Sequence, residues 1–180
     1  SELEIIGDYS FSMSAIQNIF IPSKVKIIKN NAFYYCKKLK IVNFSKNSNL
    51  KTLCKSSFSS TSLHEISIPS TVTKIDNSAF FSCKYLKYFN IPNDSKLEII
   101  GERIFDQTAI QCISFPSHLE KIDKNTFHYF NDRIFYCNAL KIFHSPKKPC
   151  YIKDSRSNID SLNDIDILVI VNTGKYKYEI

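Results

Sequence analysis

Apolar and polar residues recur in a fixed order along the chain. The clearest copy is the stretch from Leu63 to Leu86, LHEISIPSTVTKIDNSAFFSCKYL. One aromatic position of each copy recurs at intervals of 22, 25, 22, 25 and 22 residues, at Phe11, Phe33, Phe58, Phe80, Phe105 and Phe127. A repeat of this length with fixed apolar spacing is typical of a leucine-rich-repeat solenoid, in which each coil buries its apolar side against its neighbours.

Each repeat predicts three segments. The alternation of apolar and polar residues in Leu63–Pro69 indicates a half-buried strand that proline ends. Val72 and Ile75 indicate a second, shorter extended segment, followed by turn-forming residues. Phe80 and Cys83 are expected on the inside of a single helical or 3₁₀ turn. The predicted fold is therefore a β-rich right-handed coil with a parallel sheet of first strands and short helical or 3₁₀ turns.

The repeats divide the chain into a solenoid and a cap. Residues 1–145 should form the solenoid, of about six coils with the first one partial, and polar insertions at 45–49 and 92–96 should project from one edge. After Phe127 the next strand starts 13 residues later, whereas it starts 6 residues after Phe33. We expect a bulged loop here, or a decayed repeat. Residues 146–180, with a strand at Ile165–Val171, should cap the last coil.

Composition narrows the class of protein. No apolar run is long enough to cross a bilayer, so no membrane insertion is expected in this segment. The net charge of +7 favours acidic partners, but the lysines are spread along the chain. This spread indicates a solvated surface and not nucleic-acid binding. The sequence starts at Ser1, part-way through a repeat, which suggests a fragment, so the lack of a signal peptide says little.

The six cysteines are expected to be reduced. Cys36 and Cys83 hold the same repeat position two coils apart. Two coils correspond to about 10 Å, which is too far for a disulfide bond. We interpret these cysteines as small buried apolar residues.

Catalytic chemistry is not indicated, and we predict no enzyme activity, cofactor or metal. Three isolated glycines cannot build a phosphate-binding loop, and the four histidines fall in different parts of the repeats. Cys137, His144 and Cys150 are separated by gaps of 7 and 6 residues, which match no common zinc spacing.

Partner binding is the better prediction, because the first strands of successive coils should lie side by side. Their outward residues should form two ladders. The first is Asn18, Ile41, Glu65, Tyr88, Cys112 and Ile142, and the second is Phe20, Asn43, Ser67, Asn90, Ser114 and His144. Outward aromatic and apolar residues on such a face suit an interface, although partial burial under neighbouring side chains is the alternative. Lys40 and Lys87, one position earlier in their strands, would attract an acidic partner.

The repeat units resemble a known family. IPSTVTKIDNSAFFSCKYLKYFNIP and IPSKVKIIKNNAFYYCKKLKIVNFS are similar to the BspA-like leucine-rich repeat, with the pattern IPxxVxxIxxxAFxxCxxLxxIxIP, over roughly residues 3–144. The ending NTGKYKY is also similar to that of the family. The sequence departs from the pattern at Phe130, where cysteine is expected, and at Gly7, Cys54 and Gly101, where only alternate coils keep glycine. The resemblance implies a surface-exposed protein that takes part in adhesion to host matrix or to other cells.

Two functions follow as hypotheses. The first is a monomeric, cell-surface or secreted adhesion module that binds a host-matrix or cell-surface protein through the sheet of first strands. The second is an intracellular leucine-rich-repeat scaffold, or the recognition domain of a cytoplasmic signalling protein. A signal peptide or a membrane anchor in the complete protein would favour the first.

Overall fold

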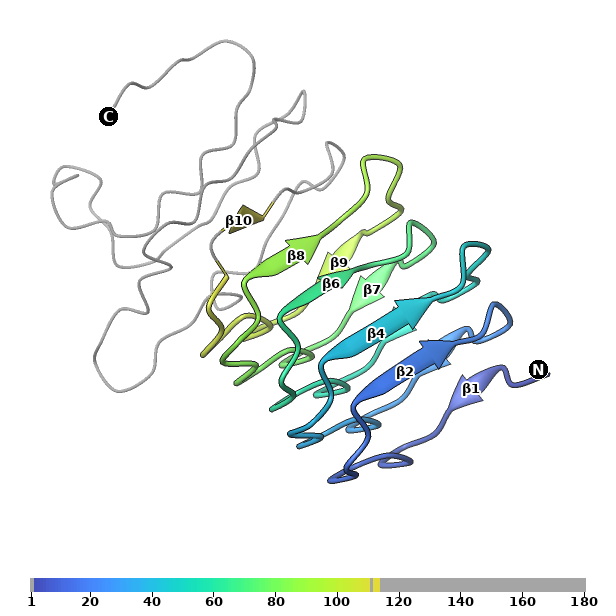
Figure 1. Cartoon of the computed structure of the whole chain (residues 1–180). Coiled ribbons are helices and arrows are strands. Elements are labelled where there is room, and N and C mark those ends of the chain that lie inside the picture. The colour runs from blue at the N-terminus through green and yellow to red at the C-terminus, as the bar shows by residue number, and fades with distance from the viewer. Residues whose placement is uncertain (1, 111, 114–180) are drawn as a thin grey trace, which may run out of the picture.

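The computed structural model describes residues 2–110 and 112–113, which wind into stacked coils (Figure 1). The strands of this part are β1 (Ile5–Ile6), β2 (Asn18–Ile21), β3 (Ile27–Ile28), β4 (Ile41–Phe44), β5 (Thr52–Leu53), β6 (Glu65–Ser67), β7 (Lys74–Ile75), β8 (Tyr88–Asn90), β9 (Ile99–Ile100) and β10 (Cys112–Ile113). They alternate between two walls, which confirms the predicted leucine-rich-repeat solenoid. The predicted irregularity after Phe127 and the predicted cap at 146–180 lie outside the described residues.

The odd-numbered strands form one continuous parallel sheet in the order β1-β3-β5-β7-β9. Each strand is two residues long. The second residue of each strand points into the solenoid and is buried, namely Ile6, Ile28, Leu53, Ile75 and Ile100. Because these strands are evenly paired, this wall sets the spacing of the coils.

The even-numbered strands form the opposite wall, which we call the strand-one wall. It consists of two separate parallel sheets, β2-β4 and β6-β8-β10. The prediction of one continuous sheet of first strands was therefore wrong, because the described part of this wall is divided between β4 and β6.

Loop length does not explain the division. β2 and β4 pair with an offset of 23 residues, as β6 and β8 do, whereas β8 and β10 pair with an offset of 24. The equivalent residues of β4 and β6, Ile41 and Glu65, are also 24 apart. Since β8 and β10 pair across the same offset, the cause must be local to β4 or β6.

Two residues at the end of β4 differ from the other coils. Phe44 and Ser45 replace an Ile-Pro pair that occurs at Ile21, Ile68 and Ile91 and the prolines that follow them. Those three isoleucines are buried, but Phe44 is only half-buried and packs against the edge of the core. A phenyl ring is larger than the space that an isoleucine column provides, and overpacking of this kind displaces neighbouring backbone.

Ser45 also ties β4 to the preceding coil. Its N–H donates to Ile21 O at 3.1 Å, and proline at the equivalent positions 69 and 92 cannot donate such a bond. The β2–β4 pairing accordingly covers four residue pairs, compared with three for β6–β8. We infer that Phe44 and Ser45 together open the strand-one wall at this point.

The segment after each odd strand is not the helical or 3₁₀ turn that the sequence suggested. Each coil instead has two residues with left-handed backbone four positions apart, such as Ser78 (φ 58°) and Ser82 (φ 57°). Alternate N–H groups bond within the coil and to the next coil: Phe81 N–H donates to Ser78 O at 3.0 Å, whereas Ser82 N–H donates to Asp106 O at 2.8 Å. In a helical turn the N–H groups point along the helix axis and could not bond to the next coil. The left-handed residues therefore allow this third side of the coil to stack on its neighbour.

The predicted aromatic column is present in the described coils, with one change. Phe11, Phe33, Phe58 and Phe80 stack nearly parallel, with ring centroids 5.1, 4.9 and 5.6 Å apart. Phe89 of the strand-one wall then packs edge-on against both Phe80 and Phe105, at 5.1 and 4.8 Å. The column therefore continues through a residue of a different repeat position. Phe127 lies outside the described residues.

Replacing a central ring of this column should destabilise the protein strongly. Phe80 is fully buried, so Phe80→Ala should lower the free energy of unfolding by about 3–5 kcal/mol, whereas exposed Ser67→Ala should be nearly neutral. Urea unfolding followed by circular dichroism would measure both. Equal and small losses would contradict the register described above.

Restoring the isoleucine column should close the strand-one wall. In Phe44→Ile the smaller side chain would match its neighbours in the column, so the amide of Ser67 should exchange with solvent at least about tenfold more slowly. Hydrogen exchange measured by NMR would test this. Thr52→Val, on the opposite wall, is the control and should leave the exchange of that amide unchanged. Unaltered exchange in Phe44→Ile would show that the phenyl ring does not hold the wall open.

Candidate functional site

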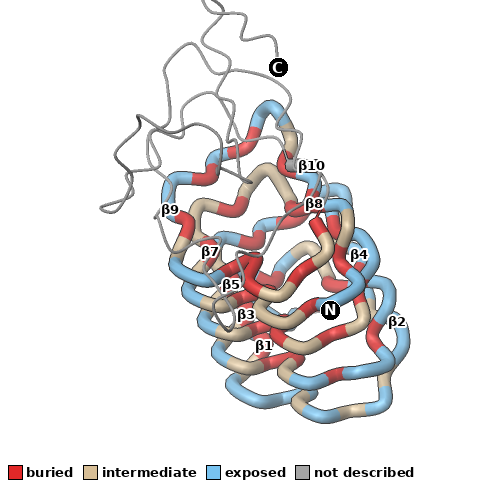
Figure 2. Tube along the Cα trace, turned by 90° about the vertical axis from the view of Figure 1, so that its left-hand side faces the viewer, coloured by how far each residue is buried: buried red, intermediate tan, exposed pale blue. Residues whose placement is uncertain are grey.

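The predicted ladder residues of β2, β4, β6 and β8 are exposed and alternate with buried or half-buried residues, so they lie on the outer face of the strand-one wall. In Figure 2 buried and exposed positions alternate along the coils. Asn18, Asn43, Glu65, Ser67 and Asn90 are exposed. Cys112 lies in β10 opposite Tyr88. Ser114, Ile142 and His144 lie outside the described residues.

Three apolar ladder residues stay well exposed. The side chains of Phe20, Ile41 and Tyr88 are 62%, 49% and 43% exposed, so each keeps an open contact surface although neighbouring side chains cover part of it. The ring of His64 lies 5.6 Å from that of Tyr88 and is tilted by 54°. The outer face thus presents separate apolar contacts among polar residues.

The ladders are not continuous, however. Pairing brings Ile41 beside Asn18, and Tyr88 beside Glu65. In the second ladder Phe20 lies beside Asn43, and Asn90 donates from Nδ2 to Ser67 Oγ at 3.3 Å. Strand pairing is interrupted between Ile41 and Glu65 in the first ladder and between Asn43 and Ser67 in the second. Each predicted ladder is therefore two shorter groups with a gap between them.

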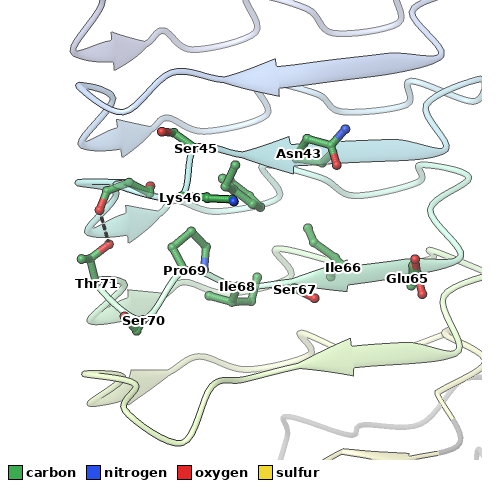
Figure 3. A pocket seen from close by; sticks show the side chains of 13 residues that line it. Asn43, Ser45, Lys46, Glu65, Ile66, Ser67, Ile68, Pro69, Ser70 and Thr71 are labelled. Carbon is green, nitrogen blue, oxygen red and sulfur yellow. Dashed lines mark hydrogen bonds between the residues drawn. The ribbon is translucent and has the colours of Figure 1, made fainter.

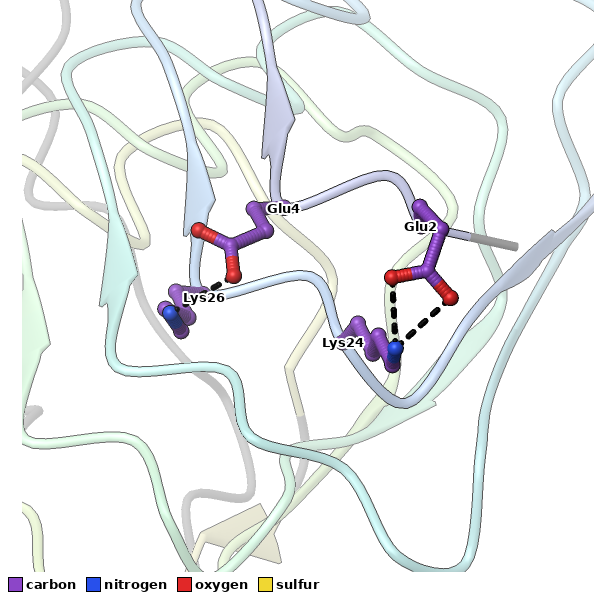
Figure 4. Close-up of polar contacts among 4 residues, drawn as sticks. All are labelled: Glu2, Glu4, Lys24 and Lys26. Carbon is purple, nitrogen blue, oxygen red and sulfur yellow. Dashed lines mark hydrogen bonds and ion pairs between the residues drawn. The ribbon is translucent and has the colours of Figure 1, made fainter.

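The basic residues of this wall are not neutralised by the ion pairs of the described part. Those pairs are Lys24–Glu2 (2.6 Å), Lys26–Glu4 (2.9 Å), Lys29–Asp8 (4.0 Å), Lys74–Asp76 (3.0 Å) and Arg103–Asp106 (2.9 Å). Figure 4 shows the first two, which join the first coils next to the odd-numbered strands. Neither exposed Lys40 nor half-buried Lys87 belongs to them.

The gap in the wall forms a groove of about 380 Å³. Figure 3 shows it between β4 and β6, which lie farther apart than the paired strands on either side. Its lining consists of Val42, Asn43, Phe44, Ser45, Lys46, Ser48, Glu65, Ile66, Ser67, Ile68, Pro69, Ser70 and Thr71. Sequence reasoning missed this groove, although the Phe44-Ser45 pair in place of Ile-Pro was a visible signal.

Hydrogen bonds between coils limit the groove at both ends. Before the strands, Ser62 N–H donates to Leu39 O at 3.1 Å. Beyond them, Thr71 Oγ1 donates to Ser48 O at 3.1 Å and to Leu50 O at 2.8 Å. The opening is therefore local to β4 and β6, and the coils are joined on either side of it.

Backbone groups of both strands face the groove. Ile41 and Ser45 donate their N–H groups to β2 or its flanking residues, so the alternation along a strand turns Val42 and Phe44 toward β6. On the other side Ile68 N–H donates to Asn90 O at 2.9 Å, which turns Glu65 and Ser67 toward β4. Two unpaired strand edges thus face each other.

Two cysteines of the described coils belong to the core. Cys36 and Cys83 are buried, as predicted, and Cys36, Cys54 and Cys83 are free. The Cys83 thiol donates to Phe58 O at 3.1 Å, and burial raises its pKa to about 11, so it stays protonated at neutral pH. No group of three or more potential metal ligands occurs among residues 2–110 and 112–113. Within the same residues no helix is long and apolar enough to span a bilayer.

Solved structures with the same fold include three leucine-rich-repeat or surface proteins. A leucine-rich-repeat protein from T. pallidum is 22% identical, with a TM-score of 0.63 over 67% of this chain and 56% of that one. A leucine-rich cell surface protein from Faecalibacterium prausnitzii is 26% identical, with a TM-score of 0.51 over 77% and 42%. The pneumococcal vaccine antigen PcpA is 17% identical, with a TM-score of 0.52 over 68% and 48%. The chain thus spans about half the length of these structures.

A comparison with curated protein sequences gives no match. The family model of the BspA type leucine-rich repeat region matches residues 4–133 in six copies. This range contains both walls, the aromatic column and the groove, and it agrees with the resemblance seen in the repeat units. The chain therefore belongs to the BspA-type leucine-rich-repeat family.

Proposed function

We propose that the chain is a protein-binding module of a cell-surface or secreted protein, and that it contributes to adhesion through the strand-one wall. The observation that carries this proposal is the exposure of Phe20, Ile41 and Tyr88 on the outer face of that wall. Exposed aromatic and apolar side chains among polar ones match the composition of protein interfaces. A rigid solenoid also presents them at low ordering cost on binding.

The proposed partner is a host-matrix or cell-surface protein with an acidic surface, bound by a monomer of this chain. Lys40 and Lys87 lie at the edge of the wall and would attract such a surface. The surface location draws support from the F. prausnitzii structure, which is named as a cell surface protein, and from the vaccine antigen among the structural relatives.

Truncation of an apolar contact on this face should speed dissociation. Tyr88→Ala or Ile41→Ala should raise the dissociation rate about tenfold, because aromatic and apolar anchors act mainly on that rate. Ile99→Ala is a matched control, since Ile99 is 51% exposed but lies on the opposite wall. Surface plasmon resonance against immobilised matrix proteins, together with adhesion of coated beads to cells, would measure the effect. If Ile99→Ala weakens binding as much as Ile41→Ala does, the strand-one wall is not the interface.

Charge reversal at the edge of the wall should act on association instead. Lys40→Glu combined with Lys87→Glu should slow association several-fold at low salt and flatten its dependence on ionic strength, because long-range attraction is lost. The same assay at about 50 and about 300 mM salt would show this, because the two concentrations lie on either side of about 100 mM, where the Debye length is about 10 Å. Lys29→Glu, beside the opposite wall, is the control. An unchanged salt dependence in the double variant would exclude these lysines from steering the partner.

A further inference from the structure

The groove between β4 and β6 exposes two strand edges that sheets normally pair or cover. Val42 and Phe44 turn their backbone groups toward β6, and Glu65 and Ser67 turn theirs toward β4. An unpaired edge is a template for another extended chain. Here two parallel edges face one space of about 380 Å³.

We propose that this groove accepts an extended peptide strand from a protein partner, which pairs with β4 on one side and β6 on the other. The inference rests on the proposed protein-binding function of the strand-one wall and deepens it by assigning the partner's bound form. The added strand would join β2-β4 to β6-β8-β10 and complete the wall. Addition of a strand to a free edge is an established way in which proteins recognise peptides.

The geometry requires a limited opening. An inserted strand needs the two edges about 9.6 Å apart, which is twice the usual spacing of about 4.8 Å between neighbouring strands. Figure 3 shows that β4 and β6 already lie farther apart than β2 and β4. The continuous sheet on the opposite wall would hold the coils together while the groove widens. The coils are joined beyond both ends of the groove, so the peptide would enter and leave through the outer face.

The lining sets the pattern of side chains that the peptide would carry. Val42 and Ile66 are buried, so peptide positions beside them would face the core and should carry a small apolar residue such as valine. Positions beside Asn43 and Ser67 face outward, where threonine matches small polar neighbours. Alternation of the two kinds follows from the pleat of the strand.

Charge determines which end of a parallel peptide should carry a basic residue and which end an acidic one. Glu65 is the first residue of β6, and Lys46 follows the end of β4, so the two lie at opposite ends of the groove (Figure 3). A strand parallel to β4 and β6 would place its amino-terminal side near Glu65 and its carboxyl-terminal side near Lys46. A basic residue at the start and an acidic residue at the end therefore suit the groove.

The direct test uses a fluorescein-labelled peptide, Thr-Lys-Val-Thr-Val-Glu-Thr, capped at both ends. The matched control is Thr-Glu-Val-Thr-Val-Lys-Thr, which has the same composition and hydrophobicity. Fluorescence polarisation at low salt should show at least tenfold tighter binding of the first peptide. N-methylation of both valines should abolish binding, because it removes backbone donors without changing charge. Equal binding of the two peptides, or no binding at about 1 mM, would overturn the proposal.

Exchange of the two charges on the protein gives a test that misfolding cannot imitate. The double variant Glu65→Lys with Lys46→Glu should prefer the control peptide by a similar factor. Retention of the original preference would exclude the groove as the binding site. Phe44→Ile, which is expected to close the wall, should weaken binding of the first peptide about tenfold or more.

A last comparison separates this inference from the function on which it rests. Tyr88 does not line the groove, so Tyr88→Ala should bind the peptide normally while it weakens adhesion to the protein partner. If adhesion depends on Tyr88 but no peptide binds in the groove, the outer face alone is the interface and the strand-insertion proposal is wrong. If the peptide binds and Tyr88→Ala leaves adhesion unchanged, the groove and not the outer face carries recognition.

Discussion

Hydrogen bonds between successive coils are the interaction on which the rest of this structure depends. No coil is large enough to bury its own apolar residues, so each relies on the coil before and after it. The odd-numbered strands meet this requirement with an unbroken parallel sheet. The left-handed residues of the turns, such as Ser78 and Ser82, meet it on a second side by directing alternate N–H groups to the next coil. With two sides fixed, the spacing of the inward phenylalanines is fixed as well.

Because the odd-numbered strands and the turns hold the coils together, the strand-one wall does not need to be paired along its whole length. Its coils stay joined outside the strands, at Ser62 and at Thr71, even where β4 and β6 do not pair. A wall that can open in one place without loss of the solenoid can present backbone groups as well as side chains. The groove and the exposed residues Phe20, Ile41 and Tyr88 are two consequences of that freedom.

Most ion pairs of the described coils lie beside the odd-numbered strands. Four of the ion pairs in the described coils involve residues that precede, occupy or follow odd-numbered strands, where lysine and carboxylate meet across coils or within one. Exposed pairs of this kind contribute little stability, and they balance charge only locally, because exposed Lys51 and Lys55 beside β5 belong to none of them. Lys40 and Lys87 also remain outside these pairs, so positive charge is available to a partner beside the apolar contacts of the strand-one wall.

The sequence by itself determined the repeat, the family, the two extended segments per coil and the inward positions. Fixed apolar spacing leaves only one way to bury Phe33, Phe58 and Phe80 together, and the buried position of Cys36 and Cys83 followed from the same register. The sequence also determined that the ladder residues point outward, because side chains along a strand alternate with a period of two. Whether those residues bind a partner is a question that periodicity cannot answer.

Only the tertiary structure decided how the coils pair. The turn type depends on backbone angles at residues such as Ser78, and serine is compatible with a helical turn as well as with the left-handed conformation found here. The edge-on position of Phe89 depends on the space left between two neighbouring coils. The division between β4 and β6 likewise coincides with a half-buried Phe44 ring and an additional bond from Ser45 N–H to β2. Such a balance of packing against hydrogen bonding is set by contacts between coils, and a repeat pattern read along one chain does not contain it.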